Sequence, residues 1–411
     1  MDKRISKPTK RFAVYRNFGG TLWHSAFLSV GMALTQPTTV IAGFITLLTG
    51  STLWIGGFVT VLMLANALPQ LWVARKVERS PTKKPVLLLA IYLRVISWAV
   101  LSIMVYTLGT DQPQLLLWAL VGLLAIFYAA GGLGGVPYTD IIGKIIPDNR
   151  RGAFFAGREL LGAPLAVGAA LLARYILGTL GYPANYGMLF GLAAGALFVA
   201  SWGFWIIREP RGPDTRKQIP SWQAYKAQLR KTGTRLQPLV MVQLLTGFSL
   251  MALPFYIAYG LKILEAPADA VGWFTLSQVL GGVLANFGWA LLVDRYGSSR
   301  MLSVCAFLSS ITPLVALVFS GFGWWGLLPA LFLSGASSTG RIVGFSSALL
   351  ELAPPTERPT FTALNATLII PVAFYPLLAG IFLQFYTYPV LFVITAVFTG
   401  MGALMTRRLP A

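Results

Sequence analysis

The sequence has little that catalysis or metal binding could use. Its 411 residues include a single cysteine, Cys305, and a single histidine, His24. One cysteine cannot form an intramolecular disulfide or a cysteine metal cluster, and one histidine cannot form a histidine metal site. The chain also has no Gly-Lys-Thr or Gly-Lys-Ser phosphate loop, and its acidic residues are scattered. We therefore expect no enzyme, no metal site and no cofactor.

Charge is also scarce. Charged residues make up 11% of the chain and hydrophobic residues 56%, and the mean hydropathy is +0.70. A soluble chain of 411 residues could not bury that much apolar surface, so the sequence indicates a protein that lies in the lipid bilayer. Its apolar segments are continuous and do not alternate with period two, which favours helices over a β-barrel. The predicted fold class is an all-α membrane protein.

Twelve apolar segments are long enough to cross a bilayer as helices. We place them at 18–46, 54–74, 86–109, 114–143, 153–178, 186–207, 238–262, 270–293, 301–321, 324–350, 360–384 and 388–406. The longest polar stretch, 208–237, predicts a cytoplasmic linker between an N-terminal six-helix bundle, 1–207, and a C-terminal one, 238–411. Part of this linker, Ser221–Lys231, has the pattern of an amphipathic helix, although a plain solvated linker explains it equally well.

The 32 basic residues outnumber the 13 acidic ones, which gives a net charge of +19. A nucleic-acid partner is not indicated, because the basic residues are spread over successive loops. These loops lie on one side of the predicted membrane, and only Arg174 and Lys262 lie near the opposite face. Since basic loops stay in the cytoplasm, we expect a multi-pass protein of the cell membrane with both termini cytoplasmic.

An internal repeat supports the division into two halves. Residues 138–154 align without gaps on residues 345–361, at an offset of 207. The alignment matches Pro147 with Pro354, Arg151 with Arg358, Phe154 with Phe361 and, further on, Pro164 with Pro371. It predicts two pseudo-symmetric bundles of common design, and parallel halves of this kind are typical of transporters.

A short charged loop follows the second span of each half. The second copy runs Ala290-Leu-Leu-Val-Asp294-Arg295-Tyr-Gly297-Ser-Ser-Arg300, and the first runs Gln70-Leu-Trp-Val-Ala74-Arg75-Lys-Val-Glu-Arg79. With the helix count, the linker and the repeat, these loops make the whole chain resemble the major facilitator superfamily, whose loop reads Gly-x-x-x-Asp-Arg-x-Gly-Arg-Arg. The resemblance implies a secondary transporter that works by alternating access. Ala74 departs from the pattern, because an aspartate is usual there.

The resemblance also implies a cytoplasmic gate. In the family, the Asp of the second loop lies near the start of helix 5, where a helix dipole and arginines can hold a carboxylate. The gating candidates here are Asp294, Arg295, Arg300, Arg75, Arg151 and Arg358. A turn that only sets topology explains the same Asp-Arg pair, and Ala74 predicts that the matching lock of the other half is absent or weaker.

Charges inside the spans are costly and must face protein or water. The hairpin of helices 4 and 5 sets Asp140 at the level of Arg158, which predicts an ion pair between them. The repeat supports it, because Asp140 maps onto Ser347 and Arg158 onto Asn365, so both charges are replaced together. A direct role in substrate binding is the alternative to this structural pair.

Glu159 maps onto Ala366 and has no charged counterpart in the second half. An acid in such surroundings could load and release a proton near neutral pH, so Glu159 is the leading candidate for proton coupling. A solvated role at the cytoplasmic mouth explains it nearly as well. His24 is the second candidate, with a hydrogen-bonded core imidazole as its alternative.

Two arginines lie within spans that carry no obvious acid, Arg94 in the third and Arg341 in the tenth. Buried arginines suit an anionic group on a substrate, while snorkelling or a bond to backbone carbonyls is the alternative for each. Helices 1, 4, 7 and 10 line the cavity of the resembled family. With polar residues of neighbouring spans, the substrate-cavity candidates are Gln36, Arg94, Gln243, Tyr256, Arg341 and Asn365.

The sequence thus predicts a monomeric secondary transporter of a small solute, with proton coupling as one mode of energising it. The arginines indicate an anionic or amphiphilic substrate. Two alternatives stay open, a lipid or lysolipid translocase and a transporter-like fold that serves as a membrane sensor or assembly factor. Substrate, direction and coupling ion do not follow from the residues.

Overall fold

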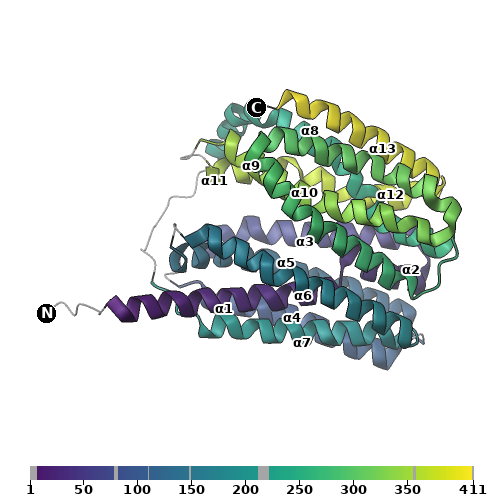
Figure 1. Cartoon of the computed structure of the whole chain (residues 1–411), viewed down its shortest axis with the longest axis horizontal. Coiled ribbons are helices and arrows are strands. Elements are labelled where there is room, and N and C mark those ends of the chain that lie inside the picture. Colours follow the sequence, from purple (N-terminus) through teal and green to yellow (C-terminus); the bar gives the residue numbers. More distant parts are fainter. Residues whose placement is uncertain are drawn as a thin grey trace. The chain divides into compact units, whose positions relative to one another are not determined.

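The computed structural model describes residues 7–77, 82–109, 111–147, 150–211, 222–354 and 358–409. These residues form helices and contain no strand, as a chain surrounded by lipid requires, since a helix satisfies its own backbone hydrogen bonds. The first helices in the sequence (Figure 1) are α1 (Lys7–Leu34), a π-helical turn η1 (Pro37–Ile41), α2 (Ala42–Thr49), α3 (Thr52–Val77), α4 (Lys84–Leu108), α5 (Pro113–Ile145), α6 (Arg151–Thr179) and α7 (Ala184–Ile206).

The second half begins with α8, which runs without a break from Trp222 to Lys262, so the end of the predicted linker is helical. The elements that follow are α9 (Ala270–Phe319), a 3-10 turn η3 (Ser320–Gly326), α10 (Leu327–Leu352), α11 (Arg358–Leu368), a 3-10 turn η4 (Ile370–Phe374), α12 (Tyr375–Phe382), α13 (Tyr388–Met405) and a last 3-10 turn η5 (Thr406–Arg408).

The fold class is confirmed. Within the described residues, nine stretches are long and apolar enough to cross a membrane. One of them, Ala270–Leu352, holds three crossings, because the backbone breaks at Gly297 (φ 79°, ψ 169°) and again at η3. The eleventh crossing is made of α11, η4 and α12, which are too short to count singly. Together these make the twelve crossings that the sequence predicts.

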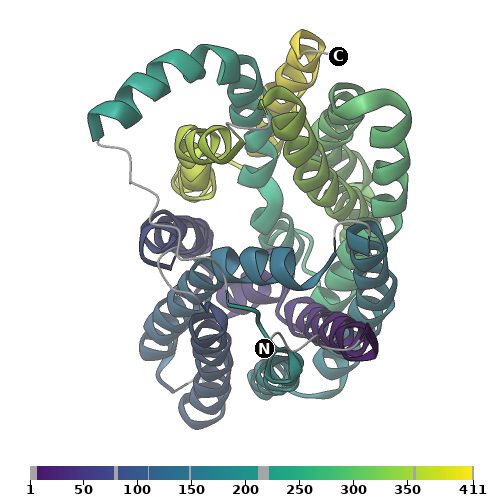
Figure 2. The ribbon, with the colours of Figure 1, turned by 90° about the vertical axis from the view of Figure 1, so that its left-hand side faces the viewer.

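Contacts divide the chain into two compact units. The first unit contains Met1–Thr35 and Ala65–Gln218, and the second contains Gln36–Leu64 and Ile219–Ala411. The segment Gln36–Leu64, made of η1, α2 and the first part of α3, therefore packs with the C-terminal helices although it belongs to the first two spans. We call this segment the hairpin. Figure 2 looks along the helices and shows those of each unit gathered into a bundle.

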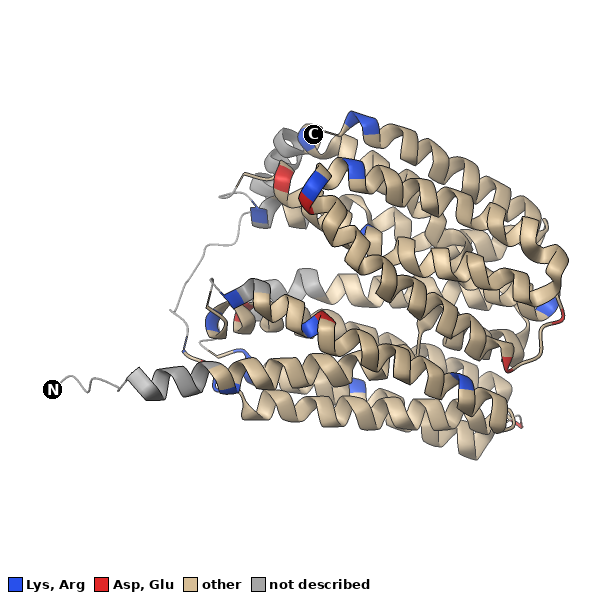
Figure 3. Cartoon of the chain, in the orientation of Figure 1, with Lys and Arg blue, Asp and Glu red and all other residues tan. Residues whose placement is uncertain are grey.

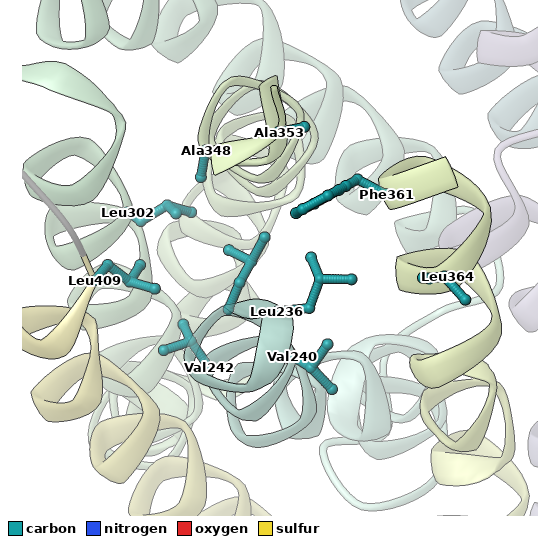
Figure 4. Close-up of a cluster of buried hydrophobic side chains, with 10 residues drawn as sticks. Leu236, Val240, Val242, Leu302, Ala348, Ala353, Phe361, Leu364 and Leu409 are labelled. Carbon is teal, nitrogen blue, oxygen red and sulfur yellow. The ribbon is translucent and has the colours of Figure 1, made fainter. Parts of the chain in front are cut away.

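Each unit has a buried apolar cluster at the position of the repeat. The N-terminal cluster includes Ile141, Ile146 and Phe154, and the C-terminal cluster includes Ala348, Ala353 and Phe361, which are their counterparts at the offset of 207 (Figure 4). Phe154 and Phe361 both have no exposed surface. The repeat in the sequence is thus a repeat in packing.

Charged residues lie mainly at the ends of the helices. In each unit, most described Lys and Arg residues gather at the end where that unit's chain terminus lies (Figure 3). The apolar stretches between the ends carry few charges, which is the distribution that a membrane-spanning bundle requires.

Candidate functional site

A pocket in the second unit surrounds Arg341 of α10. Its space, with open solvent included, is about 240 Å³, of which about 10 Å³ is available to the centre of a water-sized sphere. The residues that line it come from α8, α9 and α10 and are mostly polar: Ser249, Leu253, Tyr256, Ser309, Thr312, Ser334, Ser337, Ser338 and Arg341. No carboxylate is among them, so the guanidinium is the one formal charge on the described lining.

The hydroxyl groups of this pocket donate to their own helices. Ser334 Oγ donates to the carbonyl oxygen of Leu331 (2.8 Å), and Ser338 Oγ donates to that of Ser334 (2.7 Å). Ser249, Ser309, Thr312 and Ser337 make bonds of the same kind. Because these protons are engaged, the hydroxyl oxygens are left to accept hydrogen bonds from the pocket.

Arg341 supplies the donors. Its Nη1 atom is buried and has no hydrogen-bond partner among the described residues, while its guanidinium lies 5.3 Å from the ring centre of Phe345. Tyr256 is 2% exposed and packs against Phe392, with ring centres 4.9 Å apart. The pocket therefore offers a cation beside several acceptors.

The hairpin is held on the second unit by polar and backbone contacts. Thr275 Oγ1 of α9 and Thr39 Oγ1 lie at hydrogen-bond distance (2.8 Å), and both residues are fully buried. At the other end of the hairpin, Thr52 Oγ1 donates to the carbonyl oxygen of Gly380 (3.0 Å) in α12. Lys262 Nζ donates to the carbonyl oxygen of Gly50. These bonds join the hairpin to α8, α9 and α12.

Gln36 lies at the start of this hairpin. Its Nε2 donates to Oε1 of Gln278 in α9 over 3.4 Å. The predicted cavity residue is thus engaged in holding the hairpin to the second unit. Sequence reasoning could not find this contact, since Gln36 and Gln278 lie 242 residues apart.

Asp140 has different partners from the predicted one. Its Oδ1 lies 3.1 Å from Lys83 Nζ, and its Oδ2 lies 2.6 Å from Lys144 Nζ. Lys144 stands one turn further along α5, so it shares a helix face with Asp140. This corrects the predicted Asp140 to Arg158 pair, because two lysines already neutralise the carboxylate and Arg158 instead lies 3.9 Å from Glu159.

Glu209 is the centre of this network in the first unit. Its side chain is 2% exposed, and Lys144 Nζ lies 3.0 Å from its Oε1. The carboxylate also accepts from the backbone N–H groups of Lys83 (2.8 Å) and Lys84 (2.8 Å) at the start of α4. A buried carboxylate at a helix N-terminus is favoured by both the dipole and the charge-assisted bonds.

The two proton-coupling candidates lie in different environments. The side chains of Arg158 and Glu159 are 40% and 51% exposed. His24 is 4% exposed, its Nδ1 lies 3.1 Å from the carbonyl oxygen of Ala200, and its ring packs against Phe204. The structure places the acid at an accessible surface of its unit and the imidazole in the interior.

Arg94 lies in apolar surroundings. Its guanidinium stacks 4.3 Å from the ring centre of Phe127, and its Nη2 lies 3.5 Å from the sulfur of Met32. Its Nε is buried and lacks a hydrogen-bond partner among the described residues. Arg94 and Arg341 belong to different units, so neither unit alone brings the two predicted arginines together.

Gln243 and Asn365 satisfy each other. Gln243 Nε2 donates to Asn365 Oδ1 (2.8 Å), and Asn365 Nδ2 donates to Gln243 Oε1 (3.3 Å). Both side chains are buried, and the pair joins α8 to α11. The sequence marked both residues as cavity candidates but gave no sign that they are partners.

Known proteins resemble the chain along most of its length. It is 24% identical over 321 residues to multidrug resistance protein 2 of Bacillus subtilis strain 168, an alignment that covers 72% of this chain and 71% of that protein. A bacterial homologue of the iron transporter ferroportin, solved in the inward-facing state, matches with a TM-score of 0.70 at 12% identity, covering 96% of this chain and 98% of that one.

The xylose transporter XylE from E. coli, in a partially occluded inward-open conformation, also gives a TM-score of 0.70, at 11% identity and with 97% and 98% coverage. At such identities these two structures show the fold. The sequence profile described as Major Facilitator Superfamily matches residues 239–410. The second half of the chain thus matches the model of this superfamily, and nearly the whole chain has the fold of its transporters. This family consists of secondary transporters, so the protein acts on a small-molecule substrate.

The family's charged loop lies at the break in α9. Asp294, Arg295 and Arg300 are exposed around Gly297, and Arg358 is exposed at the start of α11. Arg75 and Arg151 lie in α3 and α6, but their side chains lie outside the described residues. The gating contact between Asp294 and the start of α6 would join the two units, and it stays a prediction.

Sequence reasoning missed Glu209 and the serines of the pocket. Glu209 follows Arg208 at the end of the sixth span, where an acid among basic loops is unusual, and this was the available signal. The serines gave a weaker one. In α10 they recur as Ser334, Ser337 and Ser338, a polar face at helical spacing beside Arg341.

Proposed function

We propose that this protein carries a small polar anion, and that Arg341 binds its negative group. The observation that supports the proposal is the buried Nη1 atom without a partner, in a pocket whose described lining has no carboxylate. A guanidinium recognises carboxylate or phosphate through two parallel hydrogen bonds. Leaving such a group unpaired is costly, so a bound anion would stabilise the pocket.

The hydroxyl groups of the lining indicate which further groups the substrate should carry. The hydroxyl oxygens of Ser334, Ser337 and Ser338 accept hydrogen bonds, so the solute should carry hydroxyl or N–H donors beside its anionic group.

The setting of the transporter is also a proposal. The basic loops support a position in the cell membrane with both termini in the cytoplasm. A proton gradient would drive transport, with Glu159 as the first candidate for the proton and His24 as the second. Asp294 with Arg295 and Arg300 would form the cytoplasmic gate together with Arg75, Arg151 and Arg358.

Ligand-induced thermal stabilisation of the purified protein tests the binding site. A panel of small carboxylates and phosphates with hydroxyl or amino groups should include one that raises the melting temperature, since a ligand that binds the folded state stabilises it. Arg341→Gln should remove that shift. Arg94→Gln is the matched control, because Arg94 is packed between Phe127 and Met32 outside the pocket. A shift that survives Arg341→Gln would contradict the proposal.

A second candidate function is export of amphiphilic compounds. It is favoured by the 24% identity to a multidrug resistance protein. Efflux of a lipophilic cationic dye from cells that express the protein distinguishes the two, because the cationic pocket should repel such a dye. Dye export that is unaffected by Arg341→Gln would favour this second function.

A further inference from the structure

Gln278 of α9 joins three elements through one amide group. Its Oε1 accepts from Thr38 Oγ1 (2.9 Å) and from Gln36 Nε2 (3.4 Å), both in or at the start of the hairpin. Its Nε2 donates to Ser334 Oγ (3.2 Å) of α10. The side chain of Gln278 is 2% exposed, so these polar partners replace water.

Ser334 is also part of the Arg341 pocket. Its hydroxyl proton is engaged by Leu331, so its oxygen has only acceptor capacity left for Gln278 and for anything in the pocket. The oxygen has two lone pairs, so a solute donor can bind beside the Gln278 amide, and two donors at one oxygen weaken each other's hydrogen bond. Pocket and hairpin therefore share one hydrogen-bond acceptor.

The backbones of α9 and α10 lie close together around Gln278, so a shift at Ser334 acts directly on Gln278. A β-carbon at Gly335, next to Ser334, would collide with the carbonyl oxygen of Gln278, so α9 and α10 pack backbone to backbone here. The amide of Gln278 is planar, so a turn that weakens the bond of Nε2 to Ser334 also moves Oε1 away from Thr38. Movement of the amide at Ser334 therefore also weakens its bond with Thr38.

We propose that Gln278 is a positioning residue that couples the occupancy of the Arg341 pocket to release of the hairpin. The inference rests on the proposed function, because it takes this pocket as the substrate site. In the absence of solute, Gln278 holds the hairpin on the second unit. A solute that donates to the oxygen of Ser334 weakens its bond with Gln278, loosens that hold and favours the state in which the hairpin is detached.

The state of the hairpin can be measured without a ligand. Thr39 and Thr275 have hydroxyl oxygens 2.8 Å apart, so two cysteines there need to approach by less than about 1 Å to form a disulfide bond of about 2.05 Å. The reporter is Thr39→Cys with Thr275→Cys in a Cys305→Ala background. Its rate of oxidative cross-linking reports the attached hairpin.

A matched pair of glycines calibrates the reporter. A β-carbon at Gly56 would collide with the carbonyl oxygen of Pro376, whereas one at Gly57 would meet its nearest neighbour, Leu377 Cδ1, at 3.8 Å. Gly56→Ala should therefore slow cross-linking, and Gly57→Ala should leave it unchanged. A reporter that passes this check, although it cross-links the hairpin to α9, also responds to displacement of the hairpin from α12.

Gln278→Leu should then lower the cross-linking rate by about tenfold, because it removes the bonds to Thr38 and Ser334 at once. Ser334→Ala should lower it by about threefold alone and cause no further loss in the Gln278→Leu background. Ser277→Ala is the control, because Ser277 bonds to the carbonyl oxygen of Leu328 in α10. That control should cross-link at the reporter's rate.

Two outcomes would overturn the proposal. One is an unchanged rate in Gln278→Leu, and the other is a Ser334→Ala effect that adds fully to that of Gln278→Leu. If Gln278→Leu does not fold, Thr38→Val replaces it, since it removes only the hairpin end of the same connection and should also be non-additive with Ser334→Ala. Loss of anion binding in Arg341→Gln is measured separately, so failure of the pocket and failure of the coupling are distinguishable.

Discussion

The repeated region lies where α5 meets α6 in the first unit and where α10 meets α11 in the second, and we call it the corner of each unit. The two corners are built from matching apolar residues and mostly unlike polar ones. Phe154 and Phe361 are equivalent and both have no exposed surface, and the pairs Ile141 with Ala348 and Ile146 with Ala353 lie in the corresponding clusters. Four polar or charged residues have unlike equivalents, Asp140 with Ser347, Lys144 with Glu351, Arg158 with Asn365 and Glu159 with Ala366, whereas Arg151 matches Arg358.

Each corner satisfies its polar groups in its own way. The first unit uses charges, with Glu209 and Asp140 neutralised by Lys83 and Lys144. The second unit uses a neutral amide pair, Gln243 with Asn365, at the place of Arg158. The difference teaches that the apolar packing carries the fold of the repeat, while the polar groups at this corner are free to diverge as long as each set is complete.

Removing the aromatic ring should test the shared part of the comparison and give the largest effect. Phe154→Ala and Phe361→Ala should each destabilise the protein by about 3 to 5 kcal/mol, because each leaves a cavity in a fully buried cluster. Denaturant unfolding in detergent measures this. Phe155→Ala is the control, since Phe155 is 50% exposed and should cost far less. A large loss in only one unit would break the equivalence.

Removing a glutamate from each corner should cost much more stability in the first unit than in the second. Glu209→Ala should cost about 3 kcal/mol, because it strands Lys144 and two backbone N–H groups around a side chain that is 2% exposed. Glu351 of the second unit is exposed and bonds to Ser298, so Glu351→Ala should cost less than about 1 kcal/mol. Glu209→Gln should lie between them. Equal losses in the two alanine variants would refute the charged role of the first corner.

The neutral pair of the second unit should show coupling of about 1 kcal/mol. Gln243→Leu and Asn365→Leu each strand a buried amide, so each single change should cost more than its share of the double change. The thermal stability of the two single variants and the double variant gives the coupling. Simple addition of the two losses would show that the amides act independently. Arg158→Leu, at the equivalent exposed position of the first unit, should leave stability nearly unchanged.

The elements with strong sequence signals were predictable. Twelve crossings followed from apolar length, and the repeat located the equivalent buried phenylalanines without any structure. Pro37 breaks the first span into α1, η1 and α2, because proline has no N–H to continue the helix, and this break was not predicted. The end of the predicted linker, from Trp222, continues as helix into α8.

The site was less predictable, because its contacts join distant residues. Helical register alone could not choose between Lys144 and Arg158 as the partner of Asp140, and Lys83 comes from a different loop. Glu209 and Lys83 are 126 residues apart, and Gln243 and Asn365 are 122 apart. The attachment of the hairpin to the second unit has no sequence pattern at all. Single residues such as Arg341 and Tyr256 were found because a charge or ring inside an apolar span is conspicuous.

The last difference between the corners, Glu159 against Ala366, should have almost no effect on stability and a specific effect on transport. The carboxylate is 51% exposed, so Glu159→Gln should change stability by about 0.5 kcal/mol or less. If Glu159 carries the coupled proton, the variant in liposomes should lose transport driven by a pH gradient but keep substrate counterflow, which needs no net change of protonation.

Loss of both activities would assign Glu159 to folding or gating. Retained gradient-driven transport would remove it from the mechanism and leave His24, whose buried imidazole bonded to Ala200 would have to open to water before it could exchange a proton.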